Sequence, residues 1–321
     1  MTNAIRSMMI GMYALVAGAG CEPGGGEPAR AGDPPSLARP AGFEIIVTNG
    51  SSINGPLVNG AARAGTEVYG LGVTGSTADG SAVLGIRLQG SDLTSVRVSD
   101  GAVLSGASLA GAVFATQAPG GAPIDLRIDT VSASPSRYHA GSTVSRYTLS
   151  YREGVSGLWR AVCGDVMGVP VAVIPLASRW SYDEGTAGGG AKLDEPDWIT
   201  FACAGHALHK CVALGYEPWT TAAGAPLGDH HQACVRAYRA DYCGDGSPHT
   251  TSGQLINLFD DLGVQPDTET WLMESEWDAD GARCLSRSRM TGGVAPDCAA
   301  GLPVCHSTIG WGDTLVVTEA P

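Results

Sequence analysis

Asp241 is the acidic residue whose setting suggests chemistry. It lies near the end of a helical pattern at residues 229–246, on the apolar face that also carries Cys234. A carboxylate on such a face is unfavourable unless it is bonded. One interpretation is the general acid or base of a hydrolase, with His249 as its partner. The interpretation that we favour is a structural carboxylate, which accepts hydrogen bonds from backbone N–H groups of the Gly-Asp-Gly turn that follows.

Histidines form a second candidate site. His206 and His209 are three residues apart on one helical pattern, and either His230 or His231 would extend them to a metal-binding set. The sequence has no His-Glu-x-x-His motif and no Gly-x-Ser-x-Gly motif. Solvent-exposed histidines on a helix surface are the simpler interpretation. We therefore predict neither a metal site nor a cofactor.

Cysteine usage divides the chain into two parts. Cys21 stands alone near the N-terminus, and eight cysteines follow in the C-terminal two thirds. An even number of cysteines in an exported chain indicates disulfides, up to four here. The eight residues are Cys163, Cys203, Cys211, Cys234, Cys243, Cys284, Cys298 and Cys305.

The N-terminal segment is typical of an export signal. Arg6 precedes an apolar stretch, and small residues lead to Cys21. This arrangement is similar to a bacterial lipobox, in which the cysteine thiol is lipidated, although Gly18 stands where that motif favours Leu. Residues 1–21 are therefore predicted to be a signal peptide ending in a lipobox, with ordinary secretory cleavage as the alternative. Residues 22–42 are rich in Pro and Gly and are expected to be a flexible linker.

Charge restricts the partners. The chain has 19 Lys and Arg against 32 Asp and Glu, a formal net charge of −13 at pH 7. Such a surface repels phosphate backbones, so we predict no nucleic-acid binding. The expected partners are a membrane, reached through the lipid anchor, and a protein or glycan of the cell envelope.

Glycine recurs every five residues from Gly50 to Gly90, and the five-residue units continue to residue 116 after an insertion at Gly101. The central position of each unit is usually apolar, and Arg63 and Ala78 are the exceptions. This pattern resembles the pentapeptide-repeat family. The resemblance implies a β-solenoid in which stacked coils turn their central apolar side chains inward. The alternative is a set of short strands separated by glycine turns, without coiling.

Beyond the repeats the pattern changes to alternating strands and two helices. Residues 123–131 and 147–152 alternate apolar and polar side chains, as half-buried strands do. Two cysteine-bearing helical patterns at 201–219 and 229–246 suggest an antiparallel helical hairpin. We expect disulfide bonds Cys203–Cys243 and Cys211–Cys234 to join its two helices, and we expect Cys284 to pair with Cys298 or Cys305.

The string RADYCGDGSPHT at residues 239–250 resembles the signature of the ADYC-domain family of secreted bacterial proteins. Supporting strings are IPLASRWSYDEG (174–185), TFACAGHALHKCVALGYEPW (200–219) and EWDADGARCLS (276–286). The resemblance covers roughly residues 122–310 and implies an exported protein with repeats upstream. It implies no particular reaction.

Together these observations predict an α+β protein. A repeat region at 43–121 is expected to form a solenoid, and 122–310 to form a disulfide-rich mixed domain with strands and a helical hairpin. The expected location is the cell envelope, as a membrane-anchored lipoprotein or a secreted protein. We expect a non-enzymatic binding or structural module, with a hydrolase that uses Asp241 and a nearby histidine as the alternative.

Overall fold

Antiparallel β-strands dominate the computed structural model, which describes residues 47–48, 51–54, 64–165, 167–290 and 295–321. The predicted signal peptide, Cys21 and the linker at 22–42 lie outside these residues, as do Val58 and Arg63 of the repeats. The described residues belong to one compact unit, Ile45–Pro321.

The larger sheet contains strands from both the repeat region and the segment that follows it. Its strand order is β2-β14-β11-β9-β8-β7-β3-β4-β5-β6, and β10 pairs with β9. The bounds are β2 (Glu67–Tyr69), β3 (Thr74–Ser76), β4 (Ala82–Gln89), β5 (Asp92–Arg97), β6 (Val103–Ser105), β7 (Val113–Gln117), β8 (Pro123–Pro135), β9 (Thr143–Glu153), β10 (Arg160–Ala161), β11 (Val173–Ala177) and β14 (Trp198–Cys203). Each neighbouring pair is antiparallel.

The long strands β8 and β9 confirm the alternation that the sequence shows. Ile124, Leu126 and Ile128 of β8 are buried, and the residues between them are only partly buried. Their partners across the ladder include Leu149 of β9, which is also buried. A strand with one face against the core produces this period of two.

The five-residue repeat does not form a solenoid, and this prediction was wrong. Its units instead form antiparallel hairpins of about ten residues, with Gly80 and Gly90 in the turns on either side of β4. Both glycines have positive φ, which glycine adopts without steric penalty. The intervening Gly85 also has positive φ, and it lies where the register between β4 and β5 shifts, as in a β-bulge.

The apolar residues at the centre of the repeat units still build much of the core. Val68, Val73, Val83, Leu93, Leu109 and Phe114 are all buried in one cluster. Val98 is the counterexample, with 61% of its surface exposed. In a hairpin the direction of a side chain depends on its distance from the turn, so a period of five does not place every central residue on the same face.

A smaller antiparallel sheet has the order β1-β17-β20-β18-β19. The bounds are β1 (Val47–Thr48), β17 (Leu255–Phe259), β18 (Leu272–Trp277), β19 (Ala282–Leu285) and β20 (Val316–Ala320). Two further hairpins pair β12 (Arg179–Trp180) with β13 (Lys192–Leu193) and β15 (Thr221–Ala222) with β16 (Ala225–Pro226). Three short 3₁₀ turns lie at Gly106–Leu109, Pro119–Gly121 and Ala299–Gly301.

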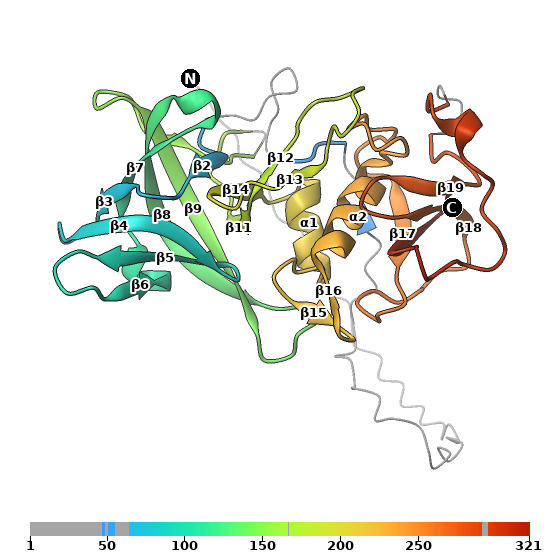
Figure 1. Cartoon of the computed structure of the whole chain (residues 1–321), viewed down its shortest axis with the longest axis horizontal. Coiled ribbons are helices and arrows are strands. Elements are labelled where there is room, and N and C mark those ends of the chain that lie inside the picture. Colours follow the sequence, from blue (N-terminus) through green and yellow to red (C-terminus); the bar gives the residue numbers. More distant parts are fainter. Residues whose placement is uncertain (1–46, 49–50, 55–63, 166, 291–294) are drawn as a thin grey trace, which may run out of the picture. The chain divides into compact units, whose positions relative to one another are not determined.

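Two α-helices lie between the sheets, α1 (Ala207–Leu214) and α2 (Gly228–Arg239) (Figure 1). Helix α1 packs against β14, and α2 packs against β18 and β20. Helix α1 falls within the predicted range 201–219, whereas α2 begins one residue before the predicted range 229–246, and both helices are shorter than predicted. From His230 to Arg239 every residue of α2 is buried, so its polar side chains must find partners inside the protein.

All eight C-terminal cysteines are paired. The predicted bond Cys211–Cys234 joins α1 to α2, and Cys284 bonds Cys305, one of its two expected partners. The predicted bond Cys203–Cys243 is wrong, because Cys203 bonds Cys163 and Cys243 bonds Cys298. Cys203 ends β14 in the larger sheet, whereas Cys243 leaves α2 toward the C-terminal loops.

The fold class also differs from the α+β prediction. The described residues form mostly antiparallel β-sheet, and their only α-helices are α1 and α2. Within the described ranges, neither helix has the length and apolarity that a membrane crossing requires.

Candidate functional site

Helix α2 ends in the Ala-Asp-Tyr-Cys motif. Ala240 adopts a left-handed conformation with φ 51°, and its N–H donates to the carbonyls of Ala237 and Arg236. This conformation costs an L-residue about 1 kcal/mol, which the surrounding contacts must offset. It ends the helix and turns the chain, so that Asp241, Tyr242 and Cys243 no longer follow the helix.

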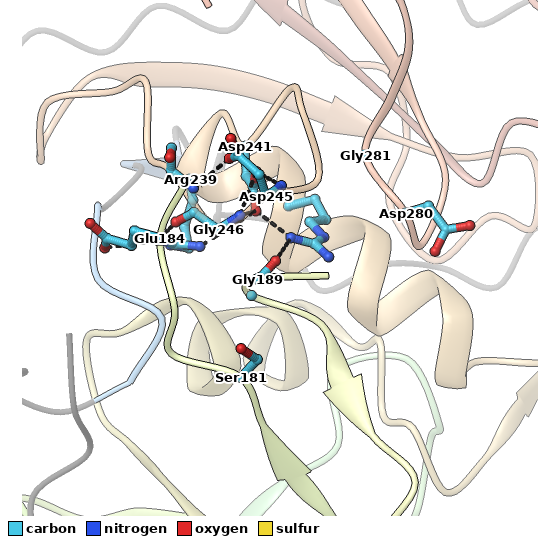
Figure 2. Close-up of polar contacts among 12 residues, drawn as sticks. Ser181, Glu184, Gly189, Arg239, Asp241, Asp245, Gly246, Asp280 and Gly281 are labelled. Carbon is cyan, nitrogen blue, oxygen red and sulfur yellow. Dashed lines mark hydrogen bonds and ion pairs between the residues drawn. The ribbon is translucent and has the colours of Figure 1, made fainter. Parts of the chain in front are cut away.

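Asp241 is fully buried at this turn (Figure 2). Its carboxylate pairs with Nη1 of Arg236 and lies 3.6 Å from Nη1 of Arg239. It also accepts hydrogen bonds from the backbone N–H groups of Asp245, at 3.2 Å, and Gly246, at 3.1 and 3.2 Å. Burial raises the pKa of the Asp241 carboxyl, and the two guanidinium groups oppose that effect. The carboxylate therefore has its partners inside the protein, including the Gly-Asp-Gly backbone that the sequence indicates.

A glycine-rich loop, residues 181–191 between β12 and β13, contacts the buried arginines. The carbonyl of Gly189 in this loop accepts a hydrogen bond from Arg236, whereas Arg239 donates to the carbonyl of Gly246 in the turn after the motif. A Cβ atom on Gly190 would lie 2.7 Å from Nη1 of Arg236. The glycines of this loop thus allow backbone to approach the guanidinium groups closely. They form part of the protein interior.

Tyr242 connects the same turn to the smaller sheet. Its hydroxyl donates to Glu274 of β18, and its ring stacks on Trp277 with 5.2 Å between the ring centroids. Arg289 binds both carboxylate oxygens of Glu274, at 2.8 and 2.7 Å, and also donates to the Ala237 carbonyl in the last turn of α2. A cation that binds carbonyls at a helix C-terminus stabilises that end.

Cys243 completes the motif through its disulfide with Cys298. Each motif residue therefore has an internal role: the turn, the ion pair, the link to β18 and the covalent bond. We call this region, Ala240–Cys243 with Arg236, Arg239, Glu274 and Arg289, the ADYC junction.

His249 lies next to the junction but does not bond to Asp241. Its backbone N–H donates to the carbonyl of Arg239 at 3.1 Å, and its ring lies 5.9 Å from that of Tyr242. Among the described residues, no hydrogen bond joins the imidazole of His249 to the carboxylate of Asp241. The structure thus brings the two predicted residues into one region without forming an acid–base pair.

The other histidines are more buried than the sequence suggests. His209, His230 and His231 are all buried, so their interpretation as solvent-exposed residues was wrong. Burial lowers the pKa of His231 to about 4, and its Nε2 lies 3.0 Å from the Leu208 carbonyl. The described part of the chain has no group of three or more side chains placed to hold a metal ion.

A cavity that the sequence does not indicate lies beside β2 and β12. It has a volume of about 560 Å³, and its polar lining includes Glu67, Arg179, Tyr182 and Asp183. The carboxylate of Glu67 accepts bonds from Arg179 Nε at 3.1 Å and from the backbone N–H of Trp180 at 3.2 Å. Burial raises the pKa of Glu67, whereas Arg179 opposes the increase. Glu67 comes from the repeat region, 112 residues before Arg179, so local sequence patterns could not join them.

Fold and site together define an antiparallel β-protein, linked by disulfides, whose signature motif is an internal junction. The family model for the ADYC domain matches residues 106–291, more than half of the chain. The chain therefore belongs to the ADYC domain family, as its motif suggested. Comparisons with curated proteins and with solved structures give no match.

Proposed function

We propose that this chain is an exported, membrane-anchored module of the cell envelope that binds a partner or has a structural role, without enzymatic activity. The observation that carries the proposal is the closed ADYC junction. Its one acidic motif residue, Asp241, is fully buried and paired with Arg236. A general acid or base must reach the proton that it transfers, and this carboxylate is enclosed by protein atoms.

Disulfides support the exported location. The four bonds connect segments across the described chain, and such bonds persist in oxidising compartments. Membrane anchoring depends on Cys21, which lies outside the described residues. The test is incorporation of radiolabelled palmitate into the protein in cells. We expect label in the wild type and none in Cys21→Ser, which should also move from the membrane fraction to the soluble fraction.

The cavity at Glu67 is the proposed place for partner contact. Its volume lies within the range of small-ligand sites, and a few fixed polar groups line it among small apolar residues. Arg179 is held there by Glu67 and by Glu195, at 3.1 Å each, so its guanidinium group is already oriented. An envelope glycan, or a protein side chain that fits the cavity, is the type of partner we propose.

Absence of catalysis can be tested with purified full-length protein against a panel of ester, peptide and glycoside substrates. His249→Gln is the informative variant, because the hydrogen bond from His249 to the junction comes from its backbone N–H and its ring only lies beside Tyr242, so the replacement should leave Asp241 in place. We expect no turnover from the wild type. Turnover that disappears in both His249→Gln and Asp241→Asn, while the folded state persists, would instead establish the hydrolase alternative.

A further inference from the structure

Basic side chains gather between helix α1 and the ends of β8 and β9. His206 is the N-cap of α1 and His209 and Lys210 lie in its first turn, and Lys210 Nζ lies 5.4 Å from the centroid of the Tyr238 ring. Arg146 of β9 and Arg137, which follows β8, approach the same region. We call these five residues the basic cluster.

A small cavity of about 30 Å³ adjoins this cluster. Arg137 and Arg146 both line it, as do Val212 and Ala213 of α1. His209 precedes these two residues by three and four positions, so it lies on the same face of the helix. Since one water-sized probe occupies about 10–15 Å³, the cavity takes two oxygen atoms of a bound group, and the remainder of that group would lie at the cavity's opening.

Two polar atoms at this place are buried without a hydrogen-bond partner. They are Nε of Arg146 and Nε2 of His209, and only 7% of the surface of His209 is exposed. An unsatisfied buried donor costs about 1–3 kcal/mol, and native proteins contain few of them. Arg146 lines the cavity and His209 lies one helical turn before the α1 residues that line it, so the two atoms indicate a group at this cavity that would bond to both.

The electrostatic setting specifies the charge of that group. Burial lowers the pKa of His209 to about 4, and the positive charges of Arg146, His206 and Lys210 add to this effect. No acidic side chain contributes to the shifts of His206, His209 or Lys210. In a chain with a formal net charge of −13, this concentration of basic side chains is a local exception.

We propose that the basic cluster is a binding site for one small oxyanion, a phosphate or the phosphoryl group of a phosphomonoester. Arg146 would donate its free Nε–H to an anion oxygen, and neutral His209 would donate or accept through its free Nε2. Charge-assisted bonds from guanidinium to phosphate are among the stronger hydrogen bonds. The acidic remainder of the surface would repel an extended polyanion, so the site suits an isolated group. This proposal does not depend on membrane anchoring or on the absence of catalysis.

Isothermal titration calorimetry with inorganic phosphate tests the proposal on the full-length protein, with chloride at matched ionic strength as the reference. We expect saturable binding to the wild type. Arg146→Gln should weaken it about tenfold or more, as the loss of a charge-assisted bond implies. Arg97→Gln is the matched control, since Arg97 forms a surface ion pair with Asp100 on the β5–β6 hairpin, and it should bind as the wild type does. Should Arg146→Gln fail to fold, Arg137→Gln alters the same cavity.

Two further measurements separate the sources of the anion and identify the site. Vesicles of phosphatidic acid in phosphatidylcholine, compared with phosphatidylcholine alone, show whether a lipid headgroup binds. NMR titration of the His209 ring should show its pKa rising from about 4 when the anion is bound, because the bound charge offsets that of Arg146. If neither free phosphate nor the phosphatidic acid vesicles bind, or if Arg146→Gln and Arg137→Gln bind as the wild type does, the proposal is wrong.

Discussion

Replacing Asp241 by Asn tests whether the ADYC junction holds the fold together. Asn has nearly the same shape, so the variant removes a charge and leaves the packing in place. Arg236 would then remain buried without the carboxylate that it pairs with, whereas Arg239 would keep its ion pair with Glu184, at 3.5 Å. Breaking a buried ion pair in this way costs about 3–5 kcal/mol.

That loss is a large part of the free energy of unfolding, which is about 5–15 kcal/mol for a folded domain. At about 2 °C per kcal/mol for a large domain, the melting temperature should fall by roughly 6–10 °C. Guanidinium titration under non-reducing conditions, followed by circular dichroism, measures the change in the free energy of unfolding, and heating with the same signal measures the change in melting temperature. Asp100→Asn is the matched control, because its partner Arg97 is on the surface and exposed ion pairs contribute little. A wild-type midpoint for Asp241→Asn would refute the structural role of this carboxylate.

Three other predictions concern the same interior. Gly188→Ala and Gly190→Ala both introduce a left-handed alanine at about 1 kcal/mol, but only the second places its Cβ 2.7 Å from a buried guanidinium nitrogen, so it should lower the unfolding midpoint further. Burial lowers the pKa of His231 to about 4, so at a pH between about 4 and 6.5 its imidazole binds a proton in the unfolded chain but not in the folded one. Stability should therefore decline as the pH falls from about 6.5 toward 4, and His231→Gln should reduce that slope in unfolding titrations across this range. A double variant, Cys211→Ala with Cys234→Ala, opens a loop with a sequence separation of 23 and should lose about 3 kcal/mol in the same assay, whereas an unchanged midpoint would argue against the bond.

Local periodicity was sufficient to place several elements. The alternation at 123–131 corresponds to β8, and the two helical patterns overlap α1 and α2. These features depend on which side of an element faces the core, and the order of apolar and polar residues within a single segment indicates that side.

The glycine repeat shows where periodicity fails. A spacing of five residues fits a solenoid coil, but it equally fits a hairpin whose turns recur every ten residues with a bulge between them. Gly80 and Gly90 lie in turns and Gly85 lies at the bulge. The five-residue spacing therefore arises from two different needs for glycine, one in the turns and one at the bulge. Only the strand pairing distinguishes these arrangements, and pairing is not a local property.

The distant partners of the motif could not be predicted from local sequence patterns either, because they also depend on how the chain folds. The sequence indicated that Asp241 would bond to the turn at 244–246, four or five residues away. It did not indicate Glu274 and Arg289, which contact the junction from 32 and 47 residues beyond Tyr242. Nor did it join Glu67 to Arg179. Each of these buried contacts exists because the fold brings together charges that could not be buried singly.

The middle strand of the smaller sheet, β20, comes from residues 316–320. It pairs with β17 on one side and β18 on the other, so the two halves of that sheet, β1 with β17 and β18 with β19, are not joined until these residues arrive. The bonds Cys163–Cys203 and Cys211–Cys234 join residues that precede it by 82 or more positions and can close earlier. During synthesis, therefore, the larger sheet and the helix pair have the residues they need well before the layer on the other side of α2. A ribosome or export channel that still holds residues 316–320 would hold the chain in a half-assembled state, with the face of α2 uncovered where β20 is to pack.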